Sequence, residues 1–138
     1  MADAVTSQTI LDGERMAIMK FTNISDGTGE SKVLKVDVSA LSSSSAGGAC
    51  DGVTITKIHV STFGMELQIY WDATTDVFCW GVPQNSQYTF DFSQFGGLTN
   101  NAGAGKTGDV LFSTVDASSG DFYTVVLEMT KHYVNPYA

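Results

Sequence analysis

Apolar and polar residues alternate along several short segments of the chain. From Met65 to Trp71 every second residue is apolar, and the same holds from Tyr123 to Met129. A period of two is typical of a β-strand with one buried face. Shorter or less regular segments of this kind are residues 16–24, 34–38, 53–60, 77–82, 88–92 and 109–115. The pattern therefore predicts about eight strands.

Turn-forming residues separate these segments, and no segment has the 3.6-residue period of an amphipathic helix. Clusters of Asp, Gly, Ser, Thr and Ala lie at residues 26–29, 72–76 and 118–121, and longer loops at residues 39–51 and 96–108. Many short strands joined by turns are typical of a β-sandwich. We therefore predict one all-β domain over residues 1–138, an antiparallel β-sandwich or jelly-roll-like fold with no long helix.

The two ends of the chain lie outside the predicted strands and contain apolar residues. Residues 1–13 precede the first predicted strand and residues 132–138 follow the last. We interpret both as assembly arms that dock on neighbouring molecules. The alternative is that they cover the edges of their own sheets. The apolar anchors of the arms would be Ile10, Leu11, Tyr133, Val134 and Tyr137. Tyr70, on the polar side of its alternating segment, is a further candidate interface residue.

The chain is acidic, with 15 Asp and Glu residues, 7 Lys and Arg residues and a formal net charge of −8. A nucleic-acid-binding protein neutralises phosphates with clusters of Lys or Arg. No such cluster occurs, so we do not expect nucleic acid as the partner. The first residues lack the features of a signal peptide, and no apolar run approaches the ~20 residues of a membrane-spanning helix. We expect a soluble protein, made in a cytoplasm, with no membrane partner.

Residues 100–107, NNAGAGKT, resemble a phosphate-binding P-loop. That motif begins with glycine and leads from a strand into a helix whose N-terminus holds the phosphate. Here Asn100 occupies the first glycine position, and the residues after Gly108 predict a strand. The segment therefore predicts a loop rather than a nucleotide site, and we expect no cofactor.

Other candidate chemistry is sparse. His59 and His132 are the only histidines, and no Gly-x-Ser-x-Gly motif accompanies them, so we expect no catalytic residue and no enzyme activity. The aspartates at turns match turn chemistry better than a calcium site. Cys50 and Cys79 do not have the spacing of a metal set; we interpret them as small buried residues, and a disulfide stays open.

Three segments of the sequence are distinctive as whole blocks: residues 6–41, residues 70–76 with the sequence YWDATTD, and residues 96–131. They resemble a family of small structural proteins of tailed bacteriophages, in particular marine and cyanobacterial ones. The resemblance covers most of the chain and implies a component of the virion, with no catalytic or ligand-binding residue to transfer.

The resemblance and the predicted fold together lead to one functional expectation. We expect a capsid decoration or cement protein that binds the outer capsid surface as a homo-oligomer, with the major capsid protein or other virion proteins as its partners. The alternative is a neck or tail component, including a module that binds host glycans through exposed aromatic side chains such as Tyr70.

Overall fold

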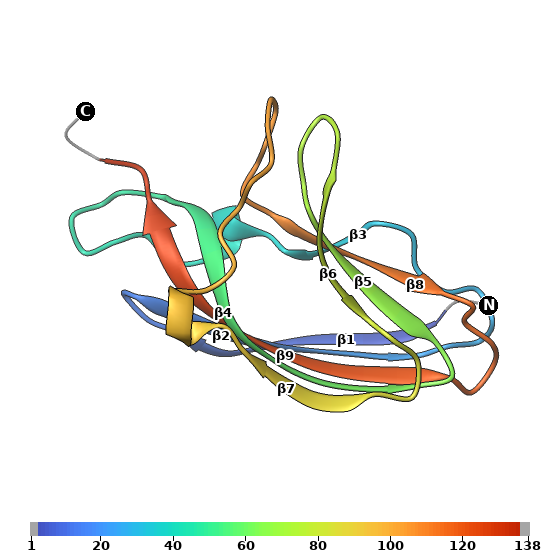
Figure 1. Cartoon of the computed structure of the whole chain (residues 1–138). Coiled ribbons are helices and arrows are strands. Elements are labelled where there is room, and N and C mark those ends of the chain that lie inside the picture. The colour runs from blue at the N-terminus through green and yellow to red at the C-terminus, as the bar shows by residue number, and fades with distance from the viewer. Residues whose placement is uncertain (1–2, 136–138) are drawn as a thin grey trace.

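Residues 3–135, the part of the chain that the computed structural model describes, fold into two antiparallel β-sheets (Figure 1). Their nine strands are β1 (Ala4–Asp12), β2 (Met16–Ile24), β3 (Val33–Val36), β4 (Cys50–Phe63), β5 (Glu66–Trp71), β6 (Val77–Val82), β7 (Gln87–Asp91), β8 (Val110–Val115) and β9 (Phe122–Tyr133). The helices of the described residues are two single 3-10 turns, η1 (Val38–Ala40) and η2 (Ser93–Phe95). Neither is long and apolar enough to cross a membrane. The all-β prediction without a long helix is confirmed.

The strand order is that of a jelly roll with one added strand. The first sheet has the order β1-β2-β9-β4-β7, and the second has β3-β8-β5-β6. Strands β2 to β9 pair first with last: β2 with β9, β3 with β8, β4 with β7, and β5 with β6. A long hairpin rolled into two facing sheets gives this pairing. β1 is additional and pairs with the free side of β2; the sequence pattern misses it and predicts eight strands.

The core lies between the two sheets and follows the predicted alternation. Its largest members include Trp71, Phe21, Phe112 and Tyr123, all almost fully buried. The ring of Phe112 packs edge-on against Phe21 and Tyr123, with ring centroids 5.3 Å and 5.8 Å apart. Because these three aromatic rings come from both sheets, they fix how the sheets face one another.

A β-bulge in β4 corrects one prediction. Simple alternation puts Val53 and Ile55 on one face of the strand and Ile58 and Val60 on the other. In the structure all four residues are buried, because the register between β4 and β9 slips at Thr56. The extra residue shifts the alternation by one position, so both apolar pairs point into the core.

A second irregularity exchanges the predicted burial of Leu34 and Lys35 in β3, whereas Val36 is buried as the pattern predicts. The sequence pattern puts Leu34 on the buried face and Lys35 outside, yet Leu34 is 48% exposed and Lys35 only 7%. The register of β3 with β8 shifts between Leu34 and Val36. The Lys35 ammonium forms an ion pair of 2.6 Å with the buried carboxylate of Glu30. That carboxylate also accepts a hydrogen bond from the Tyr123 hydroxyl, so the buried charges are paired.

Candidate assembly surfaces

β1 is exposed on both faces. The residues from Ala4 to Leu11 all lie at the surface, although successive side chains of a strand point to opposite sides. Neither face of β1 therefore packs against the second sheet. Its pairing with β2 is regular from Ala4 to Thr9 and is interrupted by a bulge at Ile10. Because nothing in the core requires apolar residues here, the strand lacks the alternation that would have predicted it.

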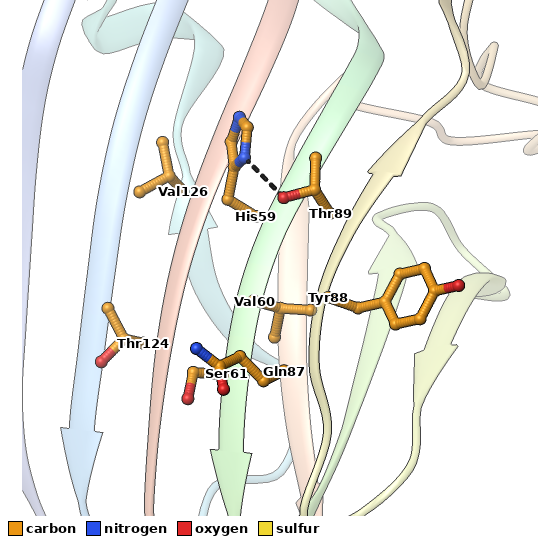
Figure 2. A pocket seen from close by; sticks show the side chains of 8 residues that line it. All are labelled: His59, Val60, Ser61, Gln87, Tyr88, Thr89, Thr124 and Val126. Carbon is orange, nitrogen blue, oxygen red and sulfur yellow. Dashed lines mark hydrogen bonds between the residues drawn. The ribbon is translucent and has the colours of Figure 1, made fainter.

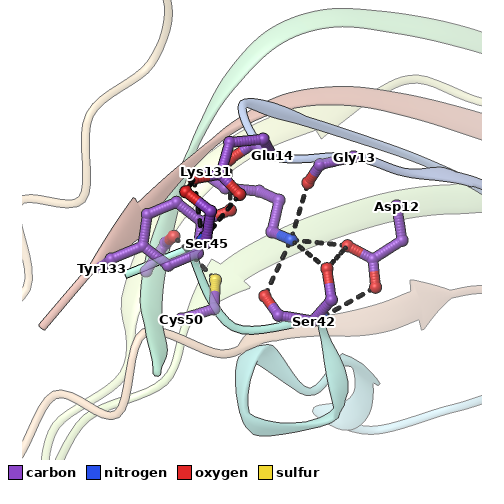
Figure 3. Close-up of polar contacts among 9 residues, drawn as sticks. Asp12, Gly13, Glu14, Ser42, Ser45, Cys50, Lys131 and Tyr133 are labelled. Atoms are coloured by element: carbon purple, nitrogen blue, oxygen red, sulfur yellow. Dashed lines mark hydrogen bonds and ion pairs between the residues drawn. The ribbon is translucent and has the colours of Figure 1, made fainter. Parts of the chain in front are cut away.

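The turn from β1 to β2 is anchored by a buried lysine (Figure 3). The side chain of Lys131, on β9, is 0% exposed. Its ammonium group donates to the Asp12 carboxylate at 2.6 Å, to the Gly13 carbonyl at 2.9 Å, and to the carbonyl and hydroxyl oxygens of Ser42 at 2.9 Å each. The charge is thus fully solvated by protein groups, which offsets much of the cost of burying it.

Two further contacts hold the same turn. The Glu14 carboxylate accepts hydrogen bonds from the backbone N–H of Ser45 at 3.0 Å and from its hydroxyl at 3.1 Å. The Tyr133 hydroxyl donates to the backbone carbonyl of Glu14, and the Lys131 ammonium lies 5.3 Å from the centre of the Tyr133 ring. The turn after β1, the loop before β4 and the end of β9 therefore form one polar cluster.

The protonation equilibria in this cluster are shifted by its contacts. Burial by itself would raise the pKa of Asp12, but the hydrogen bonds from Lys131 and Ser42 lower that pKa below its ordinary value. Burial by itself would lower the pKa of Lys131, whereas the hydrogen bonds to Asp12 and Tyr133 raise it on balance. Both side chains are therefore held in their charged forms at neutral pH.

The outer face of the first sheet has a shallow depression of about 500 Å³ (Figure 2). Its lining side chains come from β4, β7 and β9 and include His59, Ser61, Gln87, Thr89, Thr124 and Val126. His59 Nδ1 lies 3.1 Å from the Thr89 hydroxyl, and His59 Nε2 lies 2.5 Å from a carboxylate oxygen of Glu128. A hydroxyl, an imidazole and a carboxylate thus form a hydrogen-bonded row like that of a Ser-His-Asp triad, with the two ring nitrogens exchanged, since in the triad the hydroxyl contacts Nε2 and the carboxylate Nδ1.

Acyl transfer needs more than this alignment. A triad works with an oxyanion hole, in which N–H groups point at the oxygen that becomes negative. The hydroxyl of Thr89 lies on the face of a sheet, where the backbone N–H groups lie along the sheet and not out of its face. The row of Thr89, His59 and Glu128 therefore reproduces one part of such a site, the hydrogen-bonded side chains.

A row of four aromatic rings lies at the other edge of the first sheet. This aromatic ladder consists of Tyr88, Phe90, Phe92 and Phe95. Adjacent ring centroids are 5.0, 6.4 and 6.1 Å apart, and Phe90 and Phe92 are nearly parallel. Trp80 of β6 packs edge-on against Phe90 and Phe92, so the ladder joins the free edges of the two sheets. Its ends stay in solvent, because Tyr88 is 65% and Phe95 68% exposed.

The P-loop-like segment has the predicted loop conformation. It leads from η2 into strand β8, and within residues 3–135 no helix begins after it. Lys106 and Asn100 line a hollow of about 340 Å³. It is also lined by His132 and Thr54, whose side chains are hydrogen bonded at 2.6 Å. Residues 3–135 contain no group of three side chains placed to hold a metal ion. Both cysteines are free.

The structure separates the predicted interface residues. Ile10 and Leu11 lie on β1, whereas Tyr70 lies on the second sheet, where its hydroxyl donates to Gln68 and its ring contacts Phe78. Tyr133 belongs to the polar cluster and Val134 is exposed, with its N–H bonded to the carbonyl of Ala49. Tyr137 lies outside the described residues.

The structure places part of each predicted arm in the first sheet. Within residues 1–13, Ala4–Asp12 is strand β1, and within residues 132–138 the first two residues complete β9 opposite β4. Residues 4–12 and 132–133 are therefore parts of the first sheet. The exposed ends of the aromatic ladder were not singled out by the sequence analysis, although the crowding of aromatic residues between positions 70 and 95 was a usable signal.

The fold and these surfaces define a jelly-roll protein with an added, exposed edge strand. The chain matches no protein-family model, no curated protein and no solved structure.

Proposed function

We propose that this chain is a structural protein of a bacteriophage particle that decorates the outer capsid surface by binding the major capsid protein or another virion protein. The resemblance of three sequence blocks to small phage structural proteins supports the proposal that the chain is part of a bacteriophage particle. The jelly roll supports it further, because that fold recurs in viral capsid proteins, although it also occurs in lectins. One fold serves many functions, so the mode of binding has to be argued from the surface.

The observation that carries the proposal is the exposure of Tyr88 and Phe95 at the ends of the aromatic ladder. Large apolar side chains on the surface of a soluble protein mark interaction sites when they gather in one place. Aromatic residues are also enriched among the few residues that dominate a protein–protein interface. Trp80 holds the inner rings, Phe90 and Phe92, from behind, and Tyr88 and Phe95 pack against these inner rings, so the end rings lose less conformational entropy than free side chains would when a partner covers them.

The stacking of the rings bears on the alternative, a neck or tail module that holds a host glycan. A sugar binds an aromatic side chain through the face of the ring. In the ladder the faces of Phe90 are turned toward Tyr88 and Phe92. Free ring faces are therefore confined to the two ends of the ladder, Tyr88 and Phe95, and do not form one continuous aromatic platform, which favours a protein partner that surrounds those ends.

The test is binding of the purified protein to capsids that lack it, measured by co-sedimentation. We expect Tyr88→Ala and Phe95→Ala each to weaken binding by about 2 kcal/mol or more, roughly 30-fold, as for residues at the centre of an interface. Leu34→Ala is the matched control, because Leu34 is an exposed apolar residue on β3. Unchanged binding of both ladder variants would refute the role of the ladder.

Copy number in purified virions separates the capsid from the neck or tail. A protein on the capsid surface occurs in roughly hundreds of copies, whereas a neck or tail component follows a small ring symmetry of about six or twelve. Quantitative mass spectrometry against the major capsid protein gives this number. A small-ring value would replace decoration with the neck or tail alternative.

A further inference from the structure

β1 is a sheet edge without the usual protection. Among the described residues no strand pairs with its outer side. It has nine residues, whereas the edge strands β3, β6 and β7 have four, six and five. Soluble proteins protect edge strands with charges, proline, short length or a covering segment. From Ala4 to Leu11 there is no charged residue and no proline, and both faces of the strand are open.

We propose that β1 pairs antiparallel with β1 of a second copy of this chain, which joins the two first sheets into one sheet of ten strands. The first sheet of each molecule has five strands, with β1 at one edge (Figure 1). At a net charge of −8, most surfaces of the protein repel a second copy. The uncharged strand is a place where two copies meet without bringing carboxylates together.

The register of this pairing follows from the geometry of β1. Directly opposed residues of antiparallel strands share a face, and faces alternate along a strand, so self-pairing is centred on a residue. The regular part of the strand runs from Ala4 to Thr9. Centring on Ser7 pairs the uncharged residues from Ala4 to Ile10 and takes in only the bulge residue Ile10 beyond the regular part. The opposed pairs are then Ser7 with Ser7, Thr6 with Gln8, Val5 with Thr9, and Ala4 with Ile10.

The bulge at Ile10 limits the length of the pairing, and the two-fold symmetry limits the association to two molecules. A bulge interrupts the ladder and bends the strand, so pairing ends there. Each molecule has one β1, and a two-fold contact uses it completely, which gives a closed dimer rather than a fibre. The other edge of the first sheet, with the aromatic ladder, stays free in this dimer, so the inference goes beyond the proposed function and does not depend on it.

A cysteine at the centre of the pairing is the direct test. In an antiparallel pair the Cα atoms of opposed residues are about 4.5–5.5 Å apart, within disulfide range. We expect Ser7→Cys to form a covalent dimer under mild oxidation, seen on non-reducing gels. Val5→Cys is the matched control, because Val5 is exposed on the same face and its copies would lie about 13 Å apart along the strands. The wild type, with free Cys50 and Cys79, gives the background.

Sedimentation equilibrium measures the non-covalent dimer. A seven-residue strand pair is a small interface, so we expect a dissociation constant of roughly 10–100 μM that falls as salt screens the negative charge. Ser7→Lys puts two like charges at the two-fold axis, and we expect it to be monomeric with an unchanged thermal midpoint. Ser31→Lys, at an exposed loop residue, adds the same charge elsewhere and should dimerise as the wild type does.

Two results would overturn the inference. One is a wild-type protein that stays monomeric in high salt at a protein concentration about ten times the expected dissociation constant. The other is equal crosslinking of Ser7→Cys and Val5→Cys, which indicates random collision. Loss of capsid binding by Tyr88→Ala with normal dimerisation would instead concern the proposed function alone.

Discussion

Replacement of the buried Lys131 by methionine tests how the β1–β2 turn is attached to the rest of the fold. Methionine keeps an unbranched apolar stem of similar length and removes the ammonium group. Four hydrogen bonds to Asp12, Gly13 and Ser42 then disappear. The acceptors stay where the surrounding backbone holds them, so the variant measures the cost of leaving them without their donor.

The expected loss is about 2–4 kcal/mol in the free energy of unfolding. Removing one partner of a fully buried ion pair costs about 3–5 kcal/mol, because the other charge is left without compensation. Here the side chain of Asp12 is 23% exposed, so water replaces part of what Lys131 supplied and lowers the cost. For a chain of this size each kcal/mol lowers the midpoint of thermal unfolding by roughly 3–5 °C.

Urea-induced unfolding followed by circular dichroism measures this change. Lys106→Met is the control, since Lys106 is exposed and its loss should change stability by no more than about 0.5 kcal/mol. Asp12→Asn combined with Lys131→Met should cost less than the sum of the single changes, since the two groups interact directly. If Lys131→Met unfolds at the same urea concentration as the wild type, the polar cluster does not stabilise the fold.

The pH dependence of the same variants has a defined sign. The pKa of Asp12 is lowered in the folded state, so its contribution is present above the unfolded value of about 3.9 and is lost as pH falls through the folded pKa. The pKa of Lys131 is raised, so its contribution is present below about 10.4 and is lost as pH rises through the folded pKa. We expect the difference between wild type and Lys131→Met to be constant at neutral pH and to shrink at both extremes.

Three further changes test other parts of the fold. Gly108→Ala should destabilise the fold by about 2 kcal/mol more than Gly96→Ala does. Both glycines have positive φ, but of the two only Gly108 would bring the added Cβ against a backbone oxygen, that of Asp51, at 2.2 Å. Chemical denaturation measures the difference, and equal losses of stability would contradict this reasoning. The Cys79 thiol should not react with thiol reagents at pH 8 before unfolding, since burial raises its pKa to about 12. Burial also raises the pKa of Tyr123, and the hydrogen bond to Glu30 raises it further. Absorbance titration should therefore show this tyrosine ionising only when the protein unfolds in alkali. A normal titration in the folded state would refute the hydrogen bond between Tyr123 and Glu30.

Part of the fold could be predicted because its signal is local. In the segment that contains β5 and in β9, each second residue enters the core, so the alternation in the sequence is the alternation in the structure. Met65, Leu67, Tyr123 and Leu127 are fully buried as predicted. The absence of helix was visible in the same way, because no segment has a helical period.

The sequence pattern did not predict β1, because the contacts that hold this strand leave no local pattern of side chains. It is held by backbone pairing with β2 and by the Lys131 cluster at its end, and neither contact needs a pattern of side chains along the strand. The sequence pattern did not predict the candidate surfaces either. Tyr88 and Phe92 lie on one strand face in the sequence pattern, yet one is at the surface and the other in the core, because only one of them reaches the second sheet.

The sequence by itself determined that this protein is an acidic, all-β domain of short strands, because composition and alternation are properties of neighbouring residues. Only the tertiary structure decided which strands pair, where the bulges at Thr56 and Ile10 fall, and which lysines are buried. Lys35 and Lys131 look like surface residues in the chain, and their partners Glu30 and Asp12 become neighbours only when the sheets form. Such contacts depend on the free energy of the whole fold rather than on any one segment, since a buried charge is stable only where its partners converge.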